Sequence, residues 1–335
     1  MTAAGPDSSI DVLMAVHDGA AWIGDVLESL NAQTAPYSLT VWDNASTDDT
    51  VAIITRVAPN ARVVRSDDNI GFWAAIEMLS ASCSAELFLA LTDVQLAPDY
   101  LERAAAAFAG PDVGAVEGKL LQLDGGARTT IIDTVGFSID RSRRVTIAGH
   151  GEPDHGQYAH TLIFGVEGAA PMFRTQAFRD AAVDGHVIDP AFRSGALGYG
   201  DDLDLAWRLS LFGWQQVLEP EAIGWHDRST TRTTATGLSS HLARVRQRRE
   251  IPLEKRILDW VNVRASRLKN DRTRDALRDL PFIAARELMV LVYTLLVEPR
   301  VLAGLPRLAR LTPAMLRQRR IVQARARADL RHWFS

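Results

Sequence analysis

The sequence is poor in cysteine, and this scarcity excludes several kinds of protein. Its 335 residues include a single cysteine, Cys83, so neither a disulfide framework nor a cysteine-rich metal site can form. The first nine residues also lack the basic and then apolar run of a signal peptide. Together these two absences predict a protein of the reducing cytoplasm.

Long apolar runs are scarce as well. A membrane-spanning helix needs roughly 20 apolar residues, and the best stretch, between Pro281 and Pro299, is interrupted by Arg286 and Glu287. We therefore expect a helix that lies in or near the membrane interface, at the inner face of the plasma membrane, rather than one that crosses it. Six arginines follow this helix and suit an anionic surface: Arg300, Arg307, Arg310, Arg317, Arg319 and Arg320.

The rest of the composition supports a large core and an uneven charge. Hydrophobic residues make up 47% of the chain, which suffices for one large or two ordinary domains. The net charge of -4 hides an asymmetry, because residues 1–240 carry 32 acidic and 15 basic residues while residues 241–335 carry 9 and 22. We expect a catalytic domain over 1–240, ending in a Ser- and Thr-rich linker at 228–240. A basic, amphipathic helical region over 241–335 would follow it.

Strand-like and helix-like segments alternate over the first 110 residues. Short apolar runs predict strands, and apolar residues at three- and four-residue spacings predict helices. The expected strands are 9–16, 39–42, 61–64 and 87–91, and the expected helices are 20–33, 47–57, 72–82 and 98–108. This alternation favours an α/β fold with a mostly parallel, Rossmann-like sheet flanked by helices. Ligands bind such sheets at the carboxyl ends of the strands.

The pattern changes after residue 113. Strand-like runs at 113–123, 129–132 and 161–173 predict a mixed or antiparallel extension of the sheet. A glycine-rich loop at 194–200 precedes a helix with an acidic start, and a loop of this kind is suited to act as a lid. Two short strands, 214–218 and 222–225, are expected after that helix.

Acidic side chains follow several of the expected strands. Asp18, Asp43 and Asp93 each lie at a strand end, although carboxylates at such turns also cap helices or simply stay solvated. Asp93 follows an apolar strand that should lie at the centre of the sheet. Because Mg²⁺ is usually held by one or two carboxylates together with substrate phosphates, Asp93 is a candidate metal ligand.

Two further positions have chemical potential. Asp201 and Asp202 open a helix beside the glycine-rich loop, where carboxylates either interact with the helix dipole or serve as a general base for an acceptor hydroxyl. His226 ends a strand, and it is either a packed core histidine or a metal ligand.

Taken together, these segments resemble family 2 glycosyltransferases, especially their rhamnosyltransferase-like branch, over about residues 10–230. The resemblance depends on the order of short motifs rather than on any one of them. They are Val16-His17-Asp18-Gly19, Val41-Trp42-Asp43-Asn44-Ala45-Ser46-Thr47-Asp48, Asn69-Ile70-Gly71-Phe72, Thr92-Asp93-Val94, Gly200-Asp201-Asp202-Leu203-Asp204-Leu205-Ala206-Trp207-Arg208 and Trp225-His226.

The resemblance implies a GT-A fold, with a nucleotide-sugar half at about 1–110 and an acceptor half at about 111–240. Asp43 would contact the nucleotide, Asp93 would be the metal-binding last carboxylate of the DXD motif, and His226 would complete the metal site. Asp202 would be the catalytic base, with Asp201 in place of the usual Glu. The other implied donor-site positions are Val16, His17, Asp18, Asn44, Asn69, Gly71, Phe72 and Thr92, and the acceptor or supporting positions are Gly168, Asp201, Asp204 and Trp207.

The sequence also departs from the family pattern. Leu91 replaces the first DXD carboxylate, and His17-Asp18 stands where the family has Asn-Tyr-Asn. The segment from Gly71 to Glu77 lacks the usual Gly-Phe-x-x-Gly-x-Asn spacing. Because this helix start faces the donor, the last change leaves the donor sugar open.

The resulting expectation is an inverting, Mg²⁺- or Mn²⁺-dependent glycosyltransferase of cell-wall or polysaccharide biosynthesis. It would move a sugar, with rhamnose as one candidate, from a dTDP- or UDP-linked donor to a glycan, lipid-linked or secondary-metabolite acceptor. A nucleotidyltransferase and a non-catalytic nucleotide- or glycan-binding protein stay open as alternatives. The C-terminal region would face an anionic membrane, or would pack on the core or on a second copy in a homodimer. No nucleic-acid partner is expected, because no basic segment is interleaved with aromatics.

Overall fold

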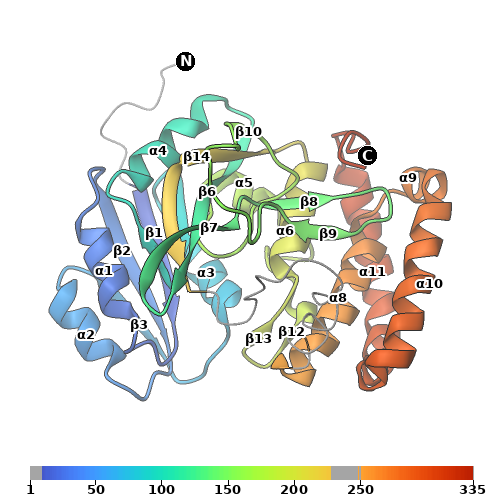
Figure 1. The fold of residues 1–335 in the computed structure, drawn as a ribbon, viewed down its shortest axis with the longest axis horizontal. Coiled ribbons are helices and arrows are strands. Elements are labelled where there is room, and N and C mark those ends of the chain that lie inside the picture. Colours follow the sequence, from blue (N-terminus) through green and yellow to red (C-terminus); the bar gives the residue numbers. More distant parts are fainter. Residues whose placement is uncertain (1–9, 228–247, 249, 335) are drawn as a thin grey trace.

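A large central sheet organises the molecule (Figure 1). The computed structural model describes residues 10–227, 248 and 250–334, so the linker expected at 228–240 lies outside the described residues. The ten-stranded sheet has the order β10-β14-β6-β11-β4-β1-β2-β3, with β5 beside β14 and β7 beside β6. Its strands are β1 Ile10–Val16, β2 Tyr37–Asn44, β3 Arg62–Ser66, β4 Leu87–Leu91, β5 Val94–Leu96, β6 Val113–Asp124, β7 Ala127–Thr134, β10 Thr161–Leu162, β11 Met172–Arg174 and β14 Gln215–His226.

The first four strands form one parallel part of the sheet, and β6 and β14 form a further parallel pair. β1 pairs in parallel with β2 on one side and with β4 on the other, and β2 pairs in parallel with β3. Both faces of β1 are buried, as its continuous apolar run predicts. Val12 and Met14 face one layer of the core and Leu13 and Ala15 face the other.

Helices cover both faces of this sheet. Helices α1 (Ile23–Asn31), α2 (Thr50–Val57) and α4 (Tyr100–Ala106) pack on the Val12 face. Helices α3 (Phe72–Ser80), α5 (Thr175–Asp180) and α6 (Asp201–Leu211) pack on the opposite face. The expected α/β architecture is therefore confirmed, since short apolar strands alternate with helices that each bury one apolar stripe.

The second half of the sheet differs in part from the expectation. The run at 161–173 forms only two short strands, β10 and β11, because most of its residues serve as a connection that packs under α6. The two strands expected at 214–218 and 222–225 are one strand, β14, with a shift in register between Glu219 and Ile223. Pro220, which cannot donate a backbone hydrogen bond, lies in that irregular stretch. Two small two-stranded sheets complete the fold: β8 (Phe137–Ile139) with β9 (Val145–Ile147), and β12 (Arg193–Ser194) with β13 (Leu197–Gly198).

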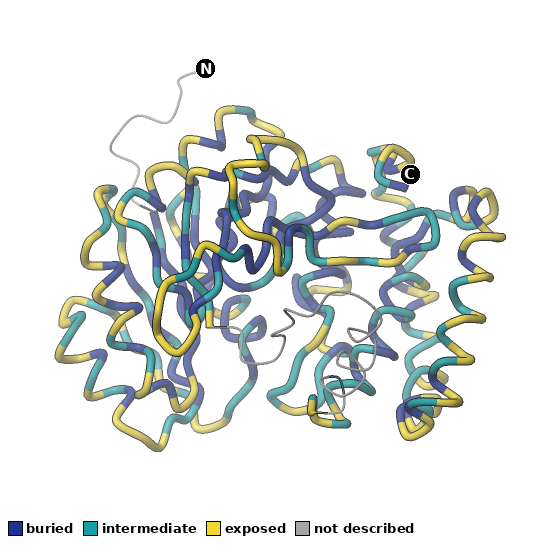
Figure 2. The backbone as a smooth tube through the Cα atoms, viewed as in Figure 1, coloured by how far each residue is buried: buried dark blue, intermediate teal, exposed yellow. Residues whose placement is uncertain are grey.

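The C-terminal helices pack on the sheet-containing part of the chain. They are α8 Leu253–Asn270, α9 Thr273–Arg278, α10 Leu280–Val297 and α11 Leu305–Arg325, with the 3₁₀ helix η3 Pro299–Gly304 between the last two. Val322 and Phe334 share a hydrophobic core with Phe164 and with Trp207 of α6. Helix α10 lies at the outer edge of the molecule, beyond α8 and α11 (Figures 1 and 2).

Candidate active site

The carboxyl end of β4 leads directly to the candidate metal ligands. Asp93 follows this strand, and β5 then pairs antiparallel with the end of β14, which places His226 opposite Val94. The His226 Nε2 atom lies 3.4 Å from Asp93 Oδ1. The two residues that the sequence assigned to a metal site are therefore adjacent, although 133 positions separate them in the chain.

A buried carboxylate holds the other side of the imidazole. Asp133 Oδ2 lies 2.8 Å from His226 Nδ1, and Asp133 is fully buried near the end of β7. Burial alone would lower the pKa of His226, but its hydrogen bonds to Asp133 and Asp93 and their charges raise this pKa to about 10. Burial in turn raises the pKa of Asp93, whereas His226 and Thr92 more than offset it and leave this pKa below its usual value.

These three side chains fit a divalent cation. A metal-bound histidine usually donates its other ring N–H to a carboxylate, which fixes its tautomer and orientation. Asp133 provides that carboxylate. With a pKa of about 10 the ring holds a proton on both nitrogens, so a cation would displace the Nε2 proton and take the lone pair that then points toward Asp93. Among the described residues no group of three or more His, Cys, Asp or Glu side chains is arranged to hold a metal alone. Substrate oxygens would therefore have to complete the coordination, as is usual for Mg²⁺.

The end of β2 carries two buried polar residues of the candidate donor site. Asp43 is fully buried, and its carboxylate accepts hydrogen bonds from Arg65 Nε at 3.2 Å and from the Ser46 backbone N–H at 3.1 Å. Asn44 Oδ1 accepts hydrogen bonds from Trp42 Nε1 and from the Ile70 N–H. Asn44 thus links the end of β2 to the loop that contains Asn69 and Gly71.

The loops after β1 and β2 are tied to each other. Val16 is buried at the end of β1, whereas His17 and Asp18 are exposed. The His17 Nδ1 atom lies 2.8 Å from the Asn44 carbonyl oxygen, and Asp18 Oδ1 accepts the Thr47 N–H at 2.7 Å. Asp18 also has a positive φ of 46°, a conformation that Asp tolerates better than most residues. The predicted donor-site residues at these two strand ends therefore form one hydrogen-bonded rim.

The glycine-rich loop covers the start of α3. Gly71 has a φ of +83°, and a Cβ atom there would lie 2.5 Å from the Ala196 carbonyl oxygen. Arg193 Nη1 donates a hydrogen bond to the Ile70 carbonyl at 3.0 Å. Asn69 Oδ1 accepts the Gly71 N–H, and Phe72 packs edge-on against Trp73. Only a glycine at position 71 allows this close approach of the 193–198 loop, the hairpin of β12 and β13, to the candidate donor site.

Asp202 lies at the start of α6, near the end of β4. A Cβ atom built on Gly168 would be 3.4 Å from Asp202 Oδ2 and 3.2 Å from Trp73 Nε1. The next residue, Ala169, accepts the Thr92 N–H through its carbonyl oxygen at 3.1 Å. Through Gly168 and Ala169 the structure thus connects Asp202 with Thr92 and Asp93.

Asp201 differs from Asp202 in its surroundings. Its side chain is buried against Gly198, where an added Cβ atom would lie 2.6 Å from Asp201 Oδ2. Burial is the main cause that raises the pKa of Asp201 to about 7, and the neighbouring charge of Asp202 adds to it. Asp202 is partly exposed. Of the two, Asp202 is the carboxylate that is accessible from the surface.

Asp204 and Trp207 lie deeper in α6 and do not face open space. Asp204 is fully buried and bonded to Lys269, Arg208 and Asn270. Trp207 is almost fully buried and stacks edge-on against Phe164. Contact with an acceptor is thereby excluded for both, which leaves them a supporting role through the position of α6.

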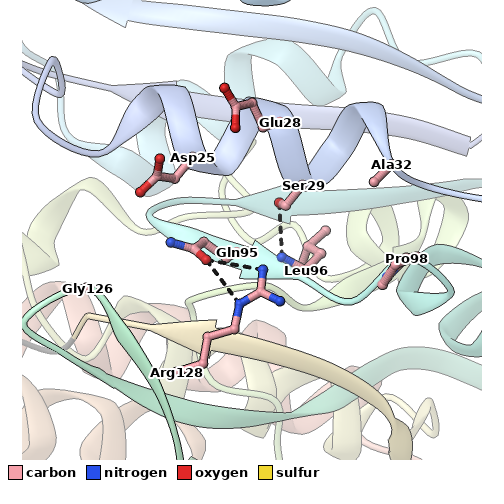
Figure 3. A pocket seen from close by; sticks show the side chains of 9 residues that line it. All are labelled: Asp25, Glu28, Ser29, Ala32, Gln95, Leu96, Pro98, Gly126 and Arg128. Atoms are coloured by element: carbon pink, nitrogen blue, oxygen red, sulfur yellow. Dashed lines mark hydrogen bonds between the residues drawn. The ribbon is translucent and has the colours of Figure 1, made fainter.

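The structure adds three residues to the site that the sequence did not single out: Trp73, Asp133 and Arg193. Asp133 directly follows the strand-like run at 129–132, which was its one available signal. Trp73 lies in the segment from Gly71 to Glu77, and Arg193 directly precedes the glycine-rich loop at 194–200. None of the predicted site residues lines the pocket of about 400 Å³ between α1, β5 and the β6–β7 turn, where Arg128 donates to Gln95 (Figure 3).

Comparison with known proteins finds a similarity to one family of enzymes. The model of glycosyl transferase family 2 matches residues 11–164, a little under half of the chain. Over these residues the chain is similar to family 2 glycosyltransferases. The match covers the strands that carry Asp43 and Asp133 and the turn that carries Asp93, and it ends before Asp202. No curated protein sequence matches the chain.

Solved structures of glycosyltransferases share the fold of this chain. Staphylococcus aureus TarS (residues 1–349) with UDP has a TM-score of 0.54 at 14% identity, covering 94% of this chain and 88% of its own. The mannosyltransferase PcManGT from Pyrobaculum calidifontis, with GDP-Man and Mn²⁺, has a TM-score of 0.50 at 15% identity and coverages of 96% and 87%. GalNAc-T7 with UDP, GalNAc and Mn²⁺ has a TM-score of 0.52 at 12% identity, and the match spans 65% of this chain but only 44% of GalNAc-T7. The GT-A fold expected from the sequence is thus confirmed, whereas the rhamnosyltransferase-like branch stays a prediction.

Proposed function

We propose that this glycosyltransferase moves a sugar from a nucleoside diphosphate sugar to an acceptor hydroxyl with inversion at the anomeric carbon. The observation that carries the proposal is that Asp93, His226 and Asp202 all lie near the end of β4. Asp93 and His226 lie 3.4 Å apart there, and Asp202 lies beside Gly168, one residue from the Ala169 carbonyl that pairs with Thr92.

The chain's own residues have distinct parts in the proposed reaction. Asp202 accepts the proton of the acceptor hydroxyl while that oxygen forms a bond to the anomeric carbon. The bond from this carbon to the diphosphate oxygen breaks on the opposite face, and the diphosphate leaves with the electron pair. Asp93 and His226 would hold a divalent cation, which supplies positive charge against the leaving diphosphate. The 193–198 loop limits the access of water to the donor.

The finer assignments of donor and acceptor follow from the resemblance. The rhamnosyltransferase-like motifs favour a dTDP- or UDP-linked donor such as dTDP-rhamnose. UDP and GDP-mannose in similar structures extend the donor panel to GDP sugars. The acceptor belongs to one of three classes, namely glycans, lipid-linked sugars and secondary metabolites, as in cell-wall or polysaccharide synthesis.

Donor turnover across this panel, measured with and without Mn²⁺ or Mg²⁺, tests the proposal. Asp202→Asn should lower transfer by roughly 10²- to 10⁴-fold, the usual contribution of a positioned general base. Donor binding, followed by thermal shift, should persist because Asp202 faces the acceptor.

A matched control is Asp112→Asn, which alters an exposed carboxylate in the turn before β6 and should leave turnover unchanged. Equal, metal-independent turnover by wild type and Asp202→Asn would refute the assignment. A panel in which every nucleotide sugar binds and none is consumed would favour the non-catalytic binding alternative.

A further inference from the structure

Helix α10 has an inverted distribution of polarity. A surface helix normally turns its polar face to water, but every exposed residue of α10 is apolar. The exposed positions are Leu280, Pro281, Phe282, Ala284, Ala285, Leu288, Met289, Leu291, Val292, Leu295 and Leu296. The face is also the most exposed apolar surface of the C-terminal region, with Leu288 62% and Leu296 78% exposed.

The polar residues of α10 face inward instead. Glu287 forms ion pairs with Arg264 at 2.8 Å and with Arg267 at 2.5 Å, both on α8. Arg286 pairs with the same carboxylate, and Thr294 is buried. The two charges that interrupt the apolar run in the sequence therefore do not interrupt the outer face.

These inward contacts favour a helix that lies along a membrane rather than across it. By length and composition α10 is the one candidate span among the described residues, with a mean hydropathy of 1.8 and 11% of its residues buried. Its 18 residues extend only about 27 Å at roughly 1.5 Å per residue, short of a hydrocarbon core of about 30 Å. A spanning orientation would also break the ion pairs of Glu287 with α8 in the middle of the helix.

The exposed side chains at the two ends of this face are mainly basic. The nearby carboxylates Asp275, Asp279 and Glu298 are buried in ion pairs. Arg274 and Arg278 before the helix pair with Asp275 and Asp279 but keep exposed guanidinium groups, and Arg300 after the helix is exposed. The apolar face is thus bordered at both ends by exposed arginine side chains.

We propose that α10 docks side-on in the interface of a membrane that contains anionic phospholipids. Its apolar face would enter the acyl boundary, and Arg274, Arg278 and Arg300 would contact the headgroups. A second copy of the chain fits less well. In a two-fold dimer through α10, parallel or antiparallel helices would both bring an arginine-bearing end against another arginine-bearing end, and like charges oppose such pairing. The docking does not depend on the proposed sugar transfer.

Vesicle flotation of the full chain tests the proposal. Wild type should float with vesicles of phosphatidylcholine and phosphatidylglycerol at low salt, and at least tenfold less with phosphatidylcholine alone. The variant Leu288→Glu/Val292→Glu/Leu295→Glu should lose binding to both. All three side chains are exposed, so circular dichroism and the Tm should stay as in wild type.

A control variant and a lipid-free measurement complete the test. Met78→Glu replaces an apolar side chain of similar exposure, 58%, on α3, and it should float like wild type. Wild type that ignores anionic vesicles, or a triple variant that binds them equally well, would overturn the proposal. So would a wild-type dimer in lipid-free light scattering that the triple variant dissociates, because α10 would then be a subunit interface.

Discussion

At the scale of single residues, the hydrogen bond between Asp133 and His226 fixes the orientation of the imidazole. Asp133 Oδ2 accepts the hydrogen bond of Nδ1–H at 2.8 Å, and Nε2 faces Asp93 at 3.4 Å. If His226 binds a metal, Asp133 is expected to act through the orientation of His226 rather than on a substrate.

Asp133→Asn should weaken the binding of Mn²⁺ by about 10- to 100-fold, the usual effect of losing a carboxylate behind a metal-bound histidine. Isothermal titration with Mn²⁺ and UDP together measures it, and Asp112→Asn serves as control. Unchanged Mn²⁺ affinity in a folded Asp133→Asn protein would separate His226 from the metal site.

Asp201 provides a pH-dependent readout. Its pKa of about 7 in the folded protein lies above the ordinary value of 3.8, so the folded state binds this proton more tightly than the unfolded chain does. The contribution of Asp201 to stability therefore falls as the pH rises from about 4 to about 7.

Asp201→Asn is neutral at every pH and removes this loss. The Tm of the variant, relative to wild type, should therefore increase between pH 5 and pH 8 in thermal unfolding followed by circular dichroism. A difference in Tm that is the same at both pH values would mean that Asp201 ionises normally.

At the scale of elements, the contact between Gly71 and the 193–198 loop couples two segments that are far apart in the sequence. Arg307 at the start of α11 donates to the carbonyls of Ala191 and Arg193, and Arg193 in turn donates to Ile70. The loop is thereby held between α11 and the candidate donor site.

Gly71→Ala should lower stability by about 1–3 kcal/mol because of its positive φ, and it should weaken donor binding by pushing the loop away from Ile70. Denaturant unfolding and titration of UDP measure the two effects. Gly24→Ala is the control, since its Cβ would meet only Ile53 at 3.8 Å and alanine favours a helix. Equal stability of the two variants would contradict the close approach of the loop.

The elements near the N-terminus could be predicted from the sequence because each shows one simple pattern of apolar residues, either a continuous run or a spacing of three and four residues. β1 and β4 are short apolar runs, and α1 places Ile23, Val26 and Leu27 on one face. The later elements depend on long-range pairing. The run at 161–173 has the composition of a strand, but β11 has only three residues that pair between β4 and β6.

The residues of the candidate site divide in the same way, into those that local pattern predicts and those that depend on long-range contacts. The positions of Asp43, Asp93 and Asp202 at strand ends and at a helix start follow from local pattern and family resemblance, while their chemical roles stay predictions. Asp133 and Arg193 could not be found in this way, because their partners His226 and Ile70 come close only when the sheet has formed.

At the scale of the whole molecule, buried ion pairs join the C-terminal helices to the sheet-containing part of the chain, residues 10–227. Lys269 of α8 lies 2.9 Å from both Asp189 and Asp204, and Arg143 lies 3.0 Å from Asp271 and from Asp279. The Lys269 pairs therefore neutralise part of the acidic excess of residues 1–240 with the basic excess of residues 241–335. The Arg143 pairs join the two segments with the signs reversed. The domain boundary at 240 stays a prediction, since it falls outside the described residues.

Lys269→Met should lower the free energy of unfolding by about 3–5 kcal/mol, because it leaves two buried carboxylates short of a cation. Arg317→Met is the control, since its pair with Asp184 is exposed and such pairs contribute about 0–1 kcal/mol. Urea unfolding measures both, and equal losses would show that the buried network adds no more than a surface pair.

The lone thiol has a practical consequence for spectroscopy. Cys83 is buried and donates to Asp11 at 2.9 Å, and burial together with that carboxylate raises its pKa to about 11. Only about one thiol in ten thousand is then ionised at pH 7, so maleimide reagents should leave it untouched. A cysteine introduced on an exposed element could carry a fluorophore or a spin label with the native Cys83 still in place. The wild-type background is thus already suited to site-specific labelling.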